Sequence, residues 1–129
     1  MNPDGGEDSC VVDFLAKTRN RPVGSLQMVR RPENSRYAGY WLFGLNVHFF
    51  YRRMGVGEGL TRAAIRRAQQ EGAEEVFLLV YGYNREALRL YDKLGFQRRM
   101  IPQLEEELRK EAETFGCRRI VMSKKLLKG

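Results

Sequence analysis

The sequence predicts a mixed α/β (α+β) domain, in which helices flank a sheet. Two observations lead to this prediction: three apolar, strand-like segments precede the first helical pattern, and helices and strands alternate after it. The chain has 129 residues, 43% of them hydrophobic, which suffices for one packed domain. We expect that domain over residues 10–129, after a polar lead at residues 1–9 that we expect to be flexible.

The first half of the chain predicts three strands. Residues Val11–Lys17 and Val23–Val29 alternate in polarity, and the turn-like segment Arg19–Pro22 joins them. A long aromatic and aliphatic run, Tyr37–Phe50, follows as the third strand. Gly44 lies within it, and a glycine inside a strand marks a bulge or a close approach to the backbone.

The second half predicts alternating helices and strands. Each helix has a stripe of apolar residues or a capping residue, and each strand is a short apolar run. The expected elements are a helix from the Gly55–Gly59 stretch to about Gln70, a strand at Glu75–Tyr81, a helix from Asn84 to Leu94, a strand at Phe96–Ile101, a helix that opens at Pro102 with Leu104, Leu108, Ala112 and Phe115 on one stripe, and a strand at Arg118–Leu126.

Composition disfavours several classes of protein. The chain has two distant cysteines, Cys10 and Cys117, and one histidine, His48, so we expect neither a metal site nor a disulfide framework, and we expect both cysteines to be buried. No apolar run approaches the ~18 residues of a membrane span, and the first residues do not read as a signal peptide. A cytoplasmic protein without a membrane partner is therefore expected.

The chain is basic, with 23 Lys and Arg against 16 Asp and Glu and a net charge of +7. Such an excess fits nucleic acid or a phosphorylated ligand. The basic residues are scattered along the chain and no RNA-binding signature is present, so nucleic acid is the weaker interpretation.

Two segments carry the chemistry. In Arg52–Leu60, a strand leads through a glycine-rich turn into a helix, and the free N–H groups of a helix N-terminus favour an anion such as phosphate. The spacing of its glycines matches neither the Walker A loop nor the dinucleotide fingerprint, and a plain tight turn is the alternative. In the second segment, Asn84 and Tyr91 are two helical turns apart and share a face, either as ligand contacts or as a cap and a core aromatic.

Together these segments resemble the GCN5-related N-acetyltransferase (GNAT) superfamily over about residues 11–126. Arg52-x-x-Gly55-x-Gly57 matches the pyrophosphate loop of that superfamily, and Asn84-x-x-Ala87-x-x-Leu90-Tyr91-x-x-x-Gly95-Phe96 matches its downstream signature. Leu45–Val47 matches the strand that lines the pantetheine arm of the cofactor. The resemblance implies a mixed, mostly antiparallel sheet flanked by helices, and acetyl-CoA as the cofactor.

The resemblance also implies roles for individual residues. The main chain of Leu45, Asn46 and Val47 would contact pantetheine and the acyl carbonyl, Asn84 would lie near the pantetheine arm, and Tyr91 would protonate the departing thiolate. The pyrophosphate would be held by the loop residues Arg52, Arg53, Met54, Gly55, Val56, Gly57 and Glu58.

The chain departs from the superfamily pattern in places that concern the acceptor. The usual N-terminal strand and two helices have no counterpart, Leu79 stands where peptide N-terminal acetylases often have a glutamate, and Tyr37–Val47 contains no carboxylate. The general base stays open between His48 and a water chain relayed by Tyr83, Tyr40 or a backbone carbonyl.

Two charged surfaces also have two interpretations each, and an aromatic surface has one. The Arg62, Arg66 and Arg67 face is either solvated or a contact for an adenosine 3′-phosphate, and Glu105–Glu107 is either solvated or a grip for a cationic acceptor. Aromatic side chains exceed what one small core needs, which predicts a homodimer; they are Trp41, Phe43, Phe49 and Phe50.

The sequence therefore predicts an N-acetyltransferase that transfers an acetyl group from acetyl-CoA to a primary amine by direct attack in a ternary complex. The acceptor would be a small-molecule or peptide amine. The alternatives are a non-catalytic module that binds CoA or acetyl-CoA and, less favoured, a basic nucleic-acid-binding protein.

Overall fold

The computed structural model describes residues 10–35 and 37–127, so the predicted lead at residues 1–9 lies outside the described residues. The elements are β1 (Cys10–Thr18), β2 (Arg21–Arg31), β3 (Gly39–Val47), the 3-10 helix η2 (Phe49–Tyr51), α1 (Val56–Gln70), β4 (Glu75–Tyr81), α2 (Arg85–Lys93), β5 (Gln97–Arg98), α3 (Pro102–Phe115) and β6 (Arg119–Lys125).

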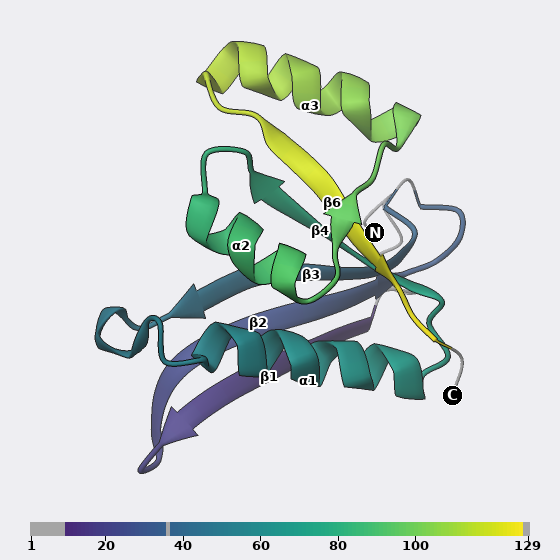
Figure 1. Ribbon diagram of the computed structural model, residues 1–129. Coiled ribbons are helices and arrows are strands. Elements are labelled where there is room, and N and C mark those ends of the chain that lie inside the picture. Colours follow the sequence, from purple (N-terminus) through teal and green to yellow (C-terminus); the bar gives the residue numbers. More distant parts are fainter. Residues whose placement is uncertain (1–9, 36, 128–129) are drawn as a thin grey trace.

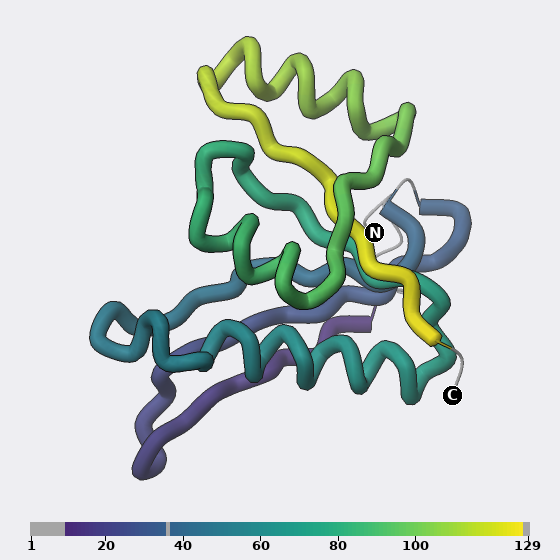
Figure 2. Tube along the Cα trace, in the orientation of Figure 1, coloured from purple at the N-terminus to yellow at the C-terminus, as the bar shows by residue number. Residues whose placement is uncertain are grey.

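The strands form one six-stranded sheet in the order β1-β2-β3-β4-β6-β5. Only β3 and β4 pair in parallel, and the other pairs are antiparallel. Helices α1 and α2 lie together on the side of the sheet that faces the viewer in Figure 1, and Figure 2 follows the same path of the chain. The predicted mixed, mostly antiparallel sheet flanked by helices is confirmed.

Strand β4 explains how the layers stack. Val76, Leu78 and Val80 belong to the larger core with α1 and α2, whereas Phe77 and Leu79 pack against the cluster that α3 covers. Because successive side chains of a strand point to opposite faces, α3 lies on the face opposite to α1 and α2. The continuous apolar run of β4 is thereby explained, because both faces of this strand are covered.

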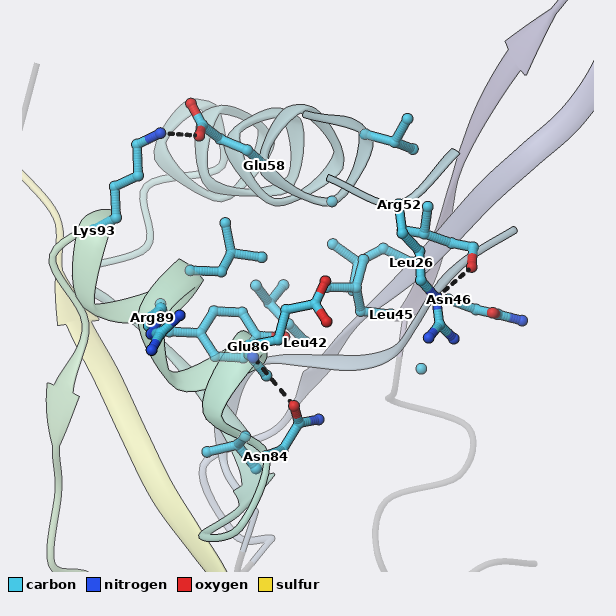
Figure 3. A pocket seen from close by; sticks show the side chains of 18 of the residues that line it. Leu26, Leu42, Leu45, Asn46, Arg52, Glu58, Asn84, Glu86, Arg89 and Lys93 are labelled. Carbon is cyan, nitrogen blue, oxygen red and sulfur yellow. Dashed lines mark hydrogen bonds and ion pairs between the residues drawn. The ribbon is translucent and has the colours of Figure 1, made fainter. Parts of the chain in front are cut away.

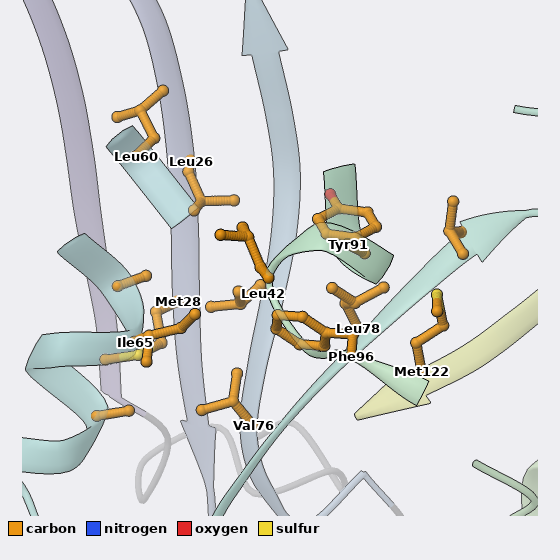
Figure 4. Packing of buried hydrophobic residues seen from close by; sticks show 14 of the residues in the cluster. Leu26, Met28, Leu42, Leu60, Ile65, Val76, Leu78, Tyr91, Phe96 and Met122 are labelled. Carbon is orange, nitrogen blue, oxygen red and sulfur yellow. The ribbon is translucent and has the colours of Figure 1, made fainter. Parts of the chain in front are cut away.

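Figure 4 shows the larger core, in which side chains of β2, β3 and β4 meet those of α1 and α2. Tyr91 on α2 and Phe96 after it belong to this core, with their rings edge to face at a centroid distance of 5.6 Å. The packing of α2 therefore fixes where Tyr91 lies relative to β3 and β4.

The third strand is shorter than the predicted Tyr37–Phe50. It ends at Val47, and His48 caps the 3-10 helix that follows, because its Nδ1 accepts a hydrogen bond from the Phe50 N–H. Phe49 and Phe50 are 73% and 78% exposed, so the apolar run predicted a strand where residues 10–35 and 37–127 provide no strand to pair with it.

Other predictions are corrected in the same way. The strand predicted at Phe96–Ile101 shrinks to Gln97–Arg98, which is all that pairs with β6. Cys10 is exposed and Cys117 half-buried rather than buried. Phe115 is exposed, although Leu104 and Leu108 of the same predicted stripe are buried.

The bulge expected at Gly44 is present. The pairing of β2 with β3 shifts between Gln27–Phe43 and Ser25–Asn46, which leaves one extra residue on β3, and Gly44 takes a φ of 66°. Glycine adopts this left-handed conformation without the steric cost of a Cβ. The bulge lies just beyond the last pair between β3 and β4, Leu42–Leu78, and it begins the site described next.

Candidate functional site

The site begins where β3 and β4 diverge. The two strands pair only at Tyr40–Leu42 with Val76–Leu78, so the main-chain groups of residues 43–47 that face β4 have no strand partner there. A pocket with a cavity volume of about 770 Å³ opens at this gap. An extended ligand with amide groups finds in this gap the hydrogen bonds that a further strand would make.

Most of the pocket lining comes from the end of β3, the end of β4, the start of α1 and one face of α2, and β2, η2 and β6 add Leu26, Tyr51 and Arg119. Figure 3 shows side chains from these elements around the cavity. The volume lies within the range of typical ligand sites, roughly 300–1,000 Å³.

The N-terminus of α1 supplies donors. Its cap residue is Gly55, with a φ of 82°, and no side chain caps the helix there. The first N–H groups of a helix have no partner within it, and together with the helix dipole they favour an anion. A Cβ at Gly57 would lie 3.5 Å from Leu90 and 3.7 Å from Leu45, so glycine keeps this slot between α2 and β3 open.

The charges around the pocket favour a polyanion. Its lining has five cationic side chains and two carboxylates, Glu58 and Glu86. The cationic side chains are Arg52, Arg53, Arg89, Lys93 and Arg119. Hydrogen bonds from Lys93 and then Arg62 lower the pKa of Glu58, so this carboxylate is ionised and already paired.

Asn84 is the N-cap of α2, as predicted, and its Oδ1 accepts a hydrogen bond from the Ala87 N–H at 3.2 Å. The cap fixes the side chain at the rim of the pocket, where the NH₂ group of the same amide still has donors to offer. The cap interpretation is therefore confirmed, and a ligand contact by Asn84 stays a prediction.

Tyr91 lines the pocket and is only 7% exposed. Its hydroxyl forms no hydrogen bond with any residue in the described part of the chain. Burial raises the pKa of this phenol above its usual value of 10.0, so it holds its proton throughout the neutral range. Tyr91 is thus a proton donor that faces a cavity and is not occupied by a partner.

The structure brings most of the predicted cofactor-binding residues together around this one pocket. Those that line it are Leu45, Asn46, Val47, Arg52, Arg53, Gly55, Val56, Gly57, Glu58, Asn84 and Tyr91. Met54 and His48 are not among the lining residues; Met54 is 67% exposed on the loop between η2 and α1.

The residues considered for the general base lie apart from Tyr91. His48 is exposed and occupied as the cap of η2, where it stacks on Phe50. The Tyr40 hydroxyl donates to Glu71, and Tyr83 stacks on Tyr81 while 68% exposed. None of these three lines the pocket, and the assignment of the base stays a prediction.

The two charged helix faces have different surroundings. On α1, Arg62 and Arg67 pair with Glu58 and Glu71 at a spacing of four residues and remain exposed. On α3, Glu105 pairs with Arg118, and Glu107 accepts a hydrogen bond from the Tyr37 hydroxyl. The Glu105–Glu107 segment is therefore partly packed against the rest of the chain and is not simply solvated.

Several lining residues escaped the sequence analysis. Glu86, Arg89 and Lys93 recur on α2 at helical spacing after the Asn84 cap, and this periodicity was a signal that pointed to one face. Arg119 had no local signal, because only the pairing of β6 with β4, at Tyr81–Arg119, brings it to the pocket.

Two kinds of site find no support in the described residues. No group of three or more His, Cys, Asp or Glu side chains there could hold a metal ion. Within the same ranges, no helix has both the length and the apolar character needed to cross a bilayer.

Comparison with known proteins identifies the family of this chain. The acetyltransferase (GNAT) family profile matches residues 3–96. The chain belongs to the GNAT family. This GNAT chain is 35% identical over 88 residues to N-alpha-acetyltransferase 30 of Saccharomyces cerevisiae, a match that covers 67% of this chain and 49% of that protein. It is 33% identical over 84 residues to a mycothiol acetyltransferase of Corynebacterium diphtheriae, which covers 64% of this chain and 28% of that protein.

The fold of the chain also matches that of a solved N-acetyltransferase structure. The PaiA N-acetyltransferase of Thermoplasma acidophilum, solved in complex with coenzyme A, aligns with a TM-score of 0.67 at 17% identity and covers 90% of this chain and 61% of that one. The matches to the two sequence relatives span about half and about a quarter of those relatives' own lengths.

The cofactor of the GNAT family is acetyl-CoA. The pocket fits it in three respects: the uncapped helix N-terminus suits a pyrophosphate, the unpaired edge of β3 suits an amide-containing arm, and the cationic lining suits a polyanion. The slot that Gly57 keeps open lies between the first two of these features.

Proposed function

We propose that the chain is an N-acetyltransferase that transfers the acetyl group of acetyl-CoA to a primary amine by direct attack within a ternary complex. The observation that carries the proposal is the Tyr91 hydroxyl: a protonated phenol that has no hydrogen-bond partner among the described residues and lies in the pocket between the uncapped α1 N-terminus and the open edge of β3. Family membership and relatives named as acetyltransferases support it.

The chain's own groups have distinct tasks in this proposal. Acetyl-CoA supplies the thioester. The N–H groups at the start of α1 bind and orient the pyrophosphate, with Arg52 and Arg53 beside them. Main-chain groups of residues 43–47 hold the pantetheine arm and the acyl oxygen, where preorganised donors stabilise developing negative charge.

Tyr91 then acts as the general acid. As the amine nitrogen forms its bond to the acetyl carbon and the carbon–sulfur bond breaks, the Tyr91 hydroxyl gives its proton to the sulfur. The ammonium nitrogen loses a proton to water, and the Tyr91 phenolate takes a proton back from water. The raised pKa keeps the phenol loaded with its proton before each turnover. His48 remains in the proposal only as a more distant proton acceptor that would work through water.

The acceptor class is part of the proposal. The relatives include one named for N-alpha-acetylation and one named for mycothiol, so both peptide and small-molecule amines are candidates. An acetyl-CoA assay with two amine panels, one of peptides with free N-termini and one of small amines, tests them by thiol release and product mass.

The chief alternative is a non-catalytic module that binds CoA, which is favoured by the separation of His48 from the pocket lining. Calorimetric binding of acetyl-CoA without product from either panel would select this alternative. Steeply salt-dependent binding of RNA that acetyl-CoA does not compete would instead select a nucleic-acid-binding protein. The location in the cytoplasm and the homodimer remain separate proposals, and the dimer is argued below on a different surface.

A further inference from the structure

Strand β1 is a long free edge of the sheet. It pairs with β2 along one side, and no other strand in residues 10–35 and 37–127 pairs with its outer side. The other edge strand, β5, has two residues, whereas β1 has nine. In Figure 1 β1 is the strand at the border of the sheet. A strand of this length presents a row of main-chain donors and acceptors to a further strand.

Proline, glycine and a bulge on the edge strand itself, three features that interrupt many free edges, are absent from β1, whose charged side chains are Asp13 and Lys17. The sequence of β1, CVVDFLAKT, has no proline and no glycine. The pairing of β1 with β2 contains one bulge, and its extra residue, Val23, is on β2. The outer side of β1 is therefore continuous. Val11 and Leu15, on the face turned away from α1, are 57% and 53% exposed.

We infer that this edge binds a second copy of the chain, strand against strand and antiparallel, with Leu15 on the two-fold axis. Charge complementarity selects this occupant and this register. Asp13 and Lys17 lie two residues before and two after Leu15 on the same face, so pairing about Leu15 sets each Asp13 opposite the partner's Lys17.

Other registers that keep the same faces together lose these pairs. Pairing about Asp13 sets two like charges opposite each other, pairing about Phe14 sets Asp13 opposite Leu15, and pairing about Ala16 sets Leu15 opposite Lys17. In the register centred on Leu15, in contrast, the two Leu15 side chains meet. Phe14 of each copy then lies opposite Ala16 of the other, so a large side chain packs against a small one.

The side chains are ready for this pairing. Asp13 lies beside its neighbour Gln27 on β2, whose Nε2 donates to Oδ1 at 2.9 Å, and this leaves Oδ2 for the partner's Lys17. Lys17 forms no ion pair within the described ranges. The inferred interface does not use the aromatic surface that first predicted a homodimer. Trp41 is buried at 1% exposure beneath α3, and Phe49 and Phe50, although exposed, lie in η2 and not in β1.

The inferred dimer is independent of the proposed function. No residue of β1 lines the pocket, so the second copy leaves both pockets open and completes neither. Variants of β1 are therefore expected to bind acetyl-CoA as the parent does, whether or not they dimerise. Failure of acetyl transfer and failure of dimerisation are distinguished by measuring both on the same samples.

The first test measures mass in solution by sedimentation velocity for the parent and for three charge variants. We expect a dimer for the parent. Asp13→Lys alone and Lys17→Asp alone each turn two attractive pairs into two repulsive ones and should raise the dissociation constant about tenfold or more. The combined Asp13→Lys, Lys17→Asp variant restores opposite charges and should restore the dimer. A monomeric parent, or a dimer indifferent to all three changes, overturns the inference.

The second test does not depend on those charges. In a chain with Cys10→Ser and Cys117→Ser, Leu15→Cys places two thiols opposite each other across the axis, where Cα atoms are about 4.5–5.5 Å apart and a disulfide can form. Mild oxidation should give a cross-linked dimer on a non-reducing gel. Asp13→Cys is the matched control, because its two thiols would be four residues out of register, roughly 13 Å apart. Equal cross-linking of both, or of neither, contradicts the register.

Discussion

Lys93, at the end of α2, forms an ion pair with Glu58, in the first turn of α1, with 2.7 Å between Nζ and Oε1. Two helices that meet the pocket from different directions are thus joined at the place where the α1 N-terminus is open to an anion. Figure 3 shows this pair across the upper part of the cavity. Both side chains belong to the lining, so the pair sets the local charge that an incoming pyrophosphate meets.

Glu58→Gln should strengthen the binding of CoA a few-fold. The change removes a carboxylate from the helix end where negative ligands are favoured, and it releases Lys93 and Arg62 toward the ligand. Calorimetry at low ionic strength measures the effect, which should shrink as salt rises. Glu106→Gln, on the exposed face of α3 and paired with Arg109, is the control and should leave the dissociation constant unchanged. Weaker binding by Glu58→Gln would mean that this carboxylate orients the lysine for the ligand.

Tyr91→Phe should lower kcat by roughly 10²-fold, the scale of a lost general acid, while the KM for acetyl-CoA stays within about twofold. Phenylalanine keeps the ring that packs edge to face on Phe96, so the fold and the pocket shape are retained. Initial rates of thiol release measure the effect. Tyr37→Phe, in the cluster beneath α3 and outside the pocket lining, is the control and should match the parent. Equal rates for Tyr91→Phe and the parent would remove Tyr91 from the chemistry.

The raised pKa of Tyr91 also predicts a dependence of stability on pH. Burial disfavours the phenolate in the folded chain, so between the usual pKa of 10.0 and the raised value the unfolded chain loses this proton and the folded chain keeps it. The free energy of unfolding should therefore be unaffected by Tyr91 below that window and fall as pH rises through it. Denaturant titrations of the parent and Tyr91→Phe at a series of alkaline pH values test this, and parallel curves would contradict it.

The order of the strands and helices followed from local patterns, since each element carries its own periodicity and punctuation. Asn84 as a cap, Gly44 at a bulge and the apolar run of β4 were all readable because each depends on near neighbours in the chain. The end of β3 was not readable, because Phe49 and Phe50 have strand-like side chains but no strand of the described part of the chain lies beside them. Hydrophobicity alone does not report whether a pairing partner exists.

The candidate site also has parts that the sequence predicts and parts that it does not. The glycine turn and the helix with Asn84 and Tyr91 could be found from the sequence, because the residues of each motif are close together along the chain. The opening between β3 and β4 could not, because it depends on where two strands 30 residues or more apart cease to pair. Arg119 reaches the pocket through that same tertiary pairing, and α3 buries Trp41 by packing that no local pattern encodes.

Asn84 offers a way to separate capping from ligand binding. Asn84→Ala removes the cap on α2 and should cost about 1 kcal/mol of unfolding free energy. Asn84→Asp keeps an oxygen that accepts from the Ala87 N–H but removes the NH₂ donors, so it should retain stability and still weaken acetyl-CoA binding several-fold. Thermal unfolding and calorimetry on both variants measure the two effects. If Asn84→Asp binds as tightly as the parent, the residue is a cap and nothing more.

Gly24 on β2 sets how closely α1 approaches the sheet. A Cβ there would lie 2.8 Å from Val56 Cγ1, 3.1 Å from the Asn46 carbonyl oxygen and 3.2 Å from Leu60 Cδ1, so Gly24→Ala must push the first two turns of α1 outward. We expect a loss of about 1–3 kcal/mol in unfolding free energy, the usual cost of overpacking. Because Val56 lines the pocket beside the open N–H groups, binding of CoA should weaken as well.

Gly59→Ala is the matched control, since a Cβ at this position in the same helix would meet nothing within 4 Å. Alanine there should raise the unfolding free energy by about 0.5–1 kcal/mol, through a better helix former, and leave CoA binding as it is. Chemical denaturation measures the unfolding free energy of Gly24→Ala and Gly59→Ala, and calorimetry measures their affinity for CoA. The comparison separates a methyl group added between α1 and the sheet from one added on the open side of α1. A Gly24→Ala chain that binds CoA with the parent's affinity would show that the anion site does not depend on how α1 is seated against β2 and β3.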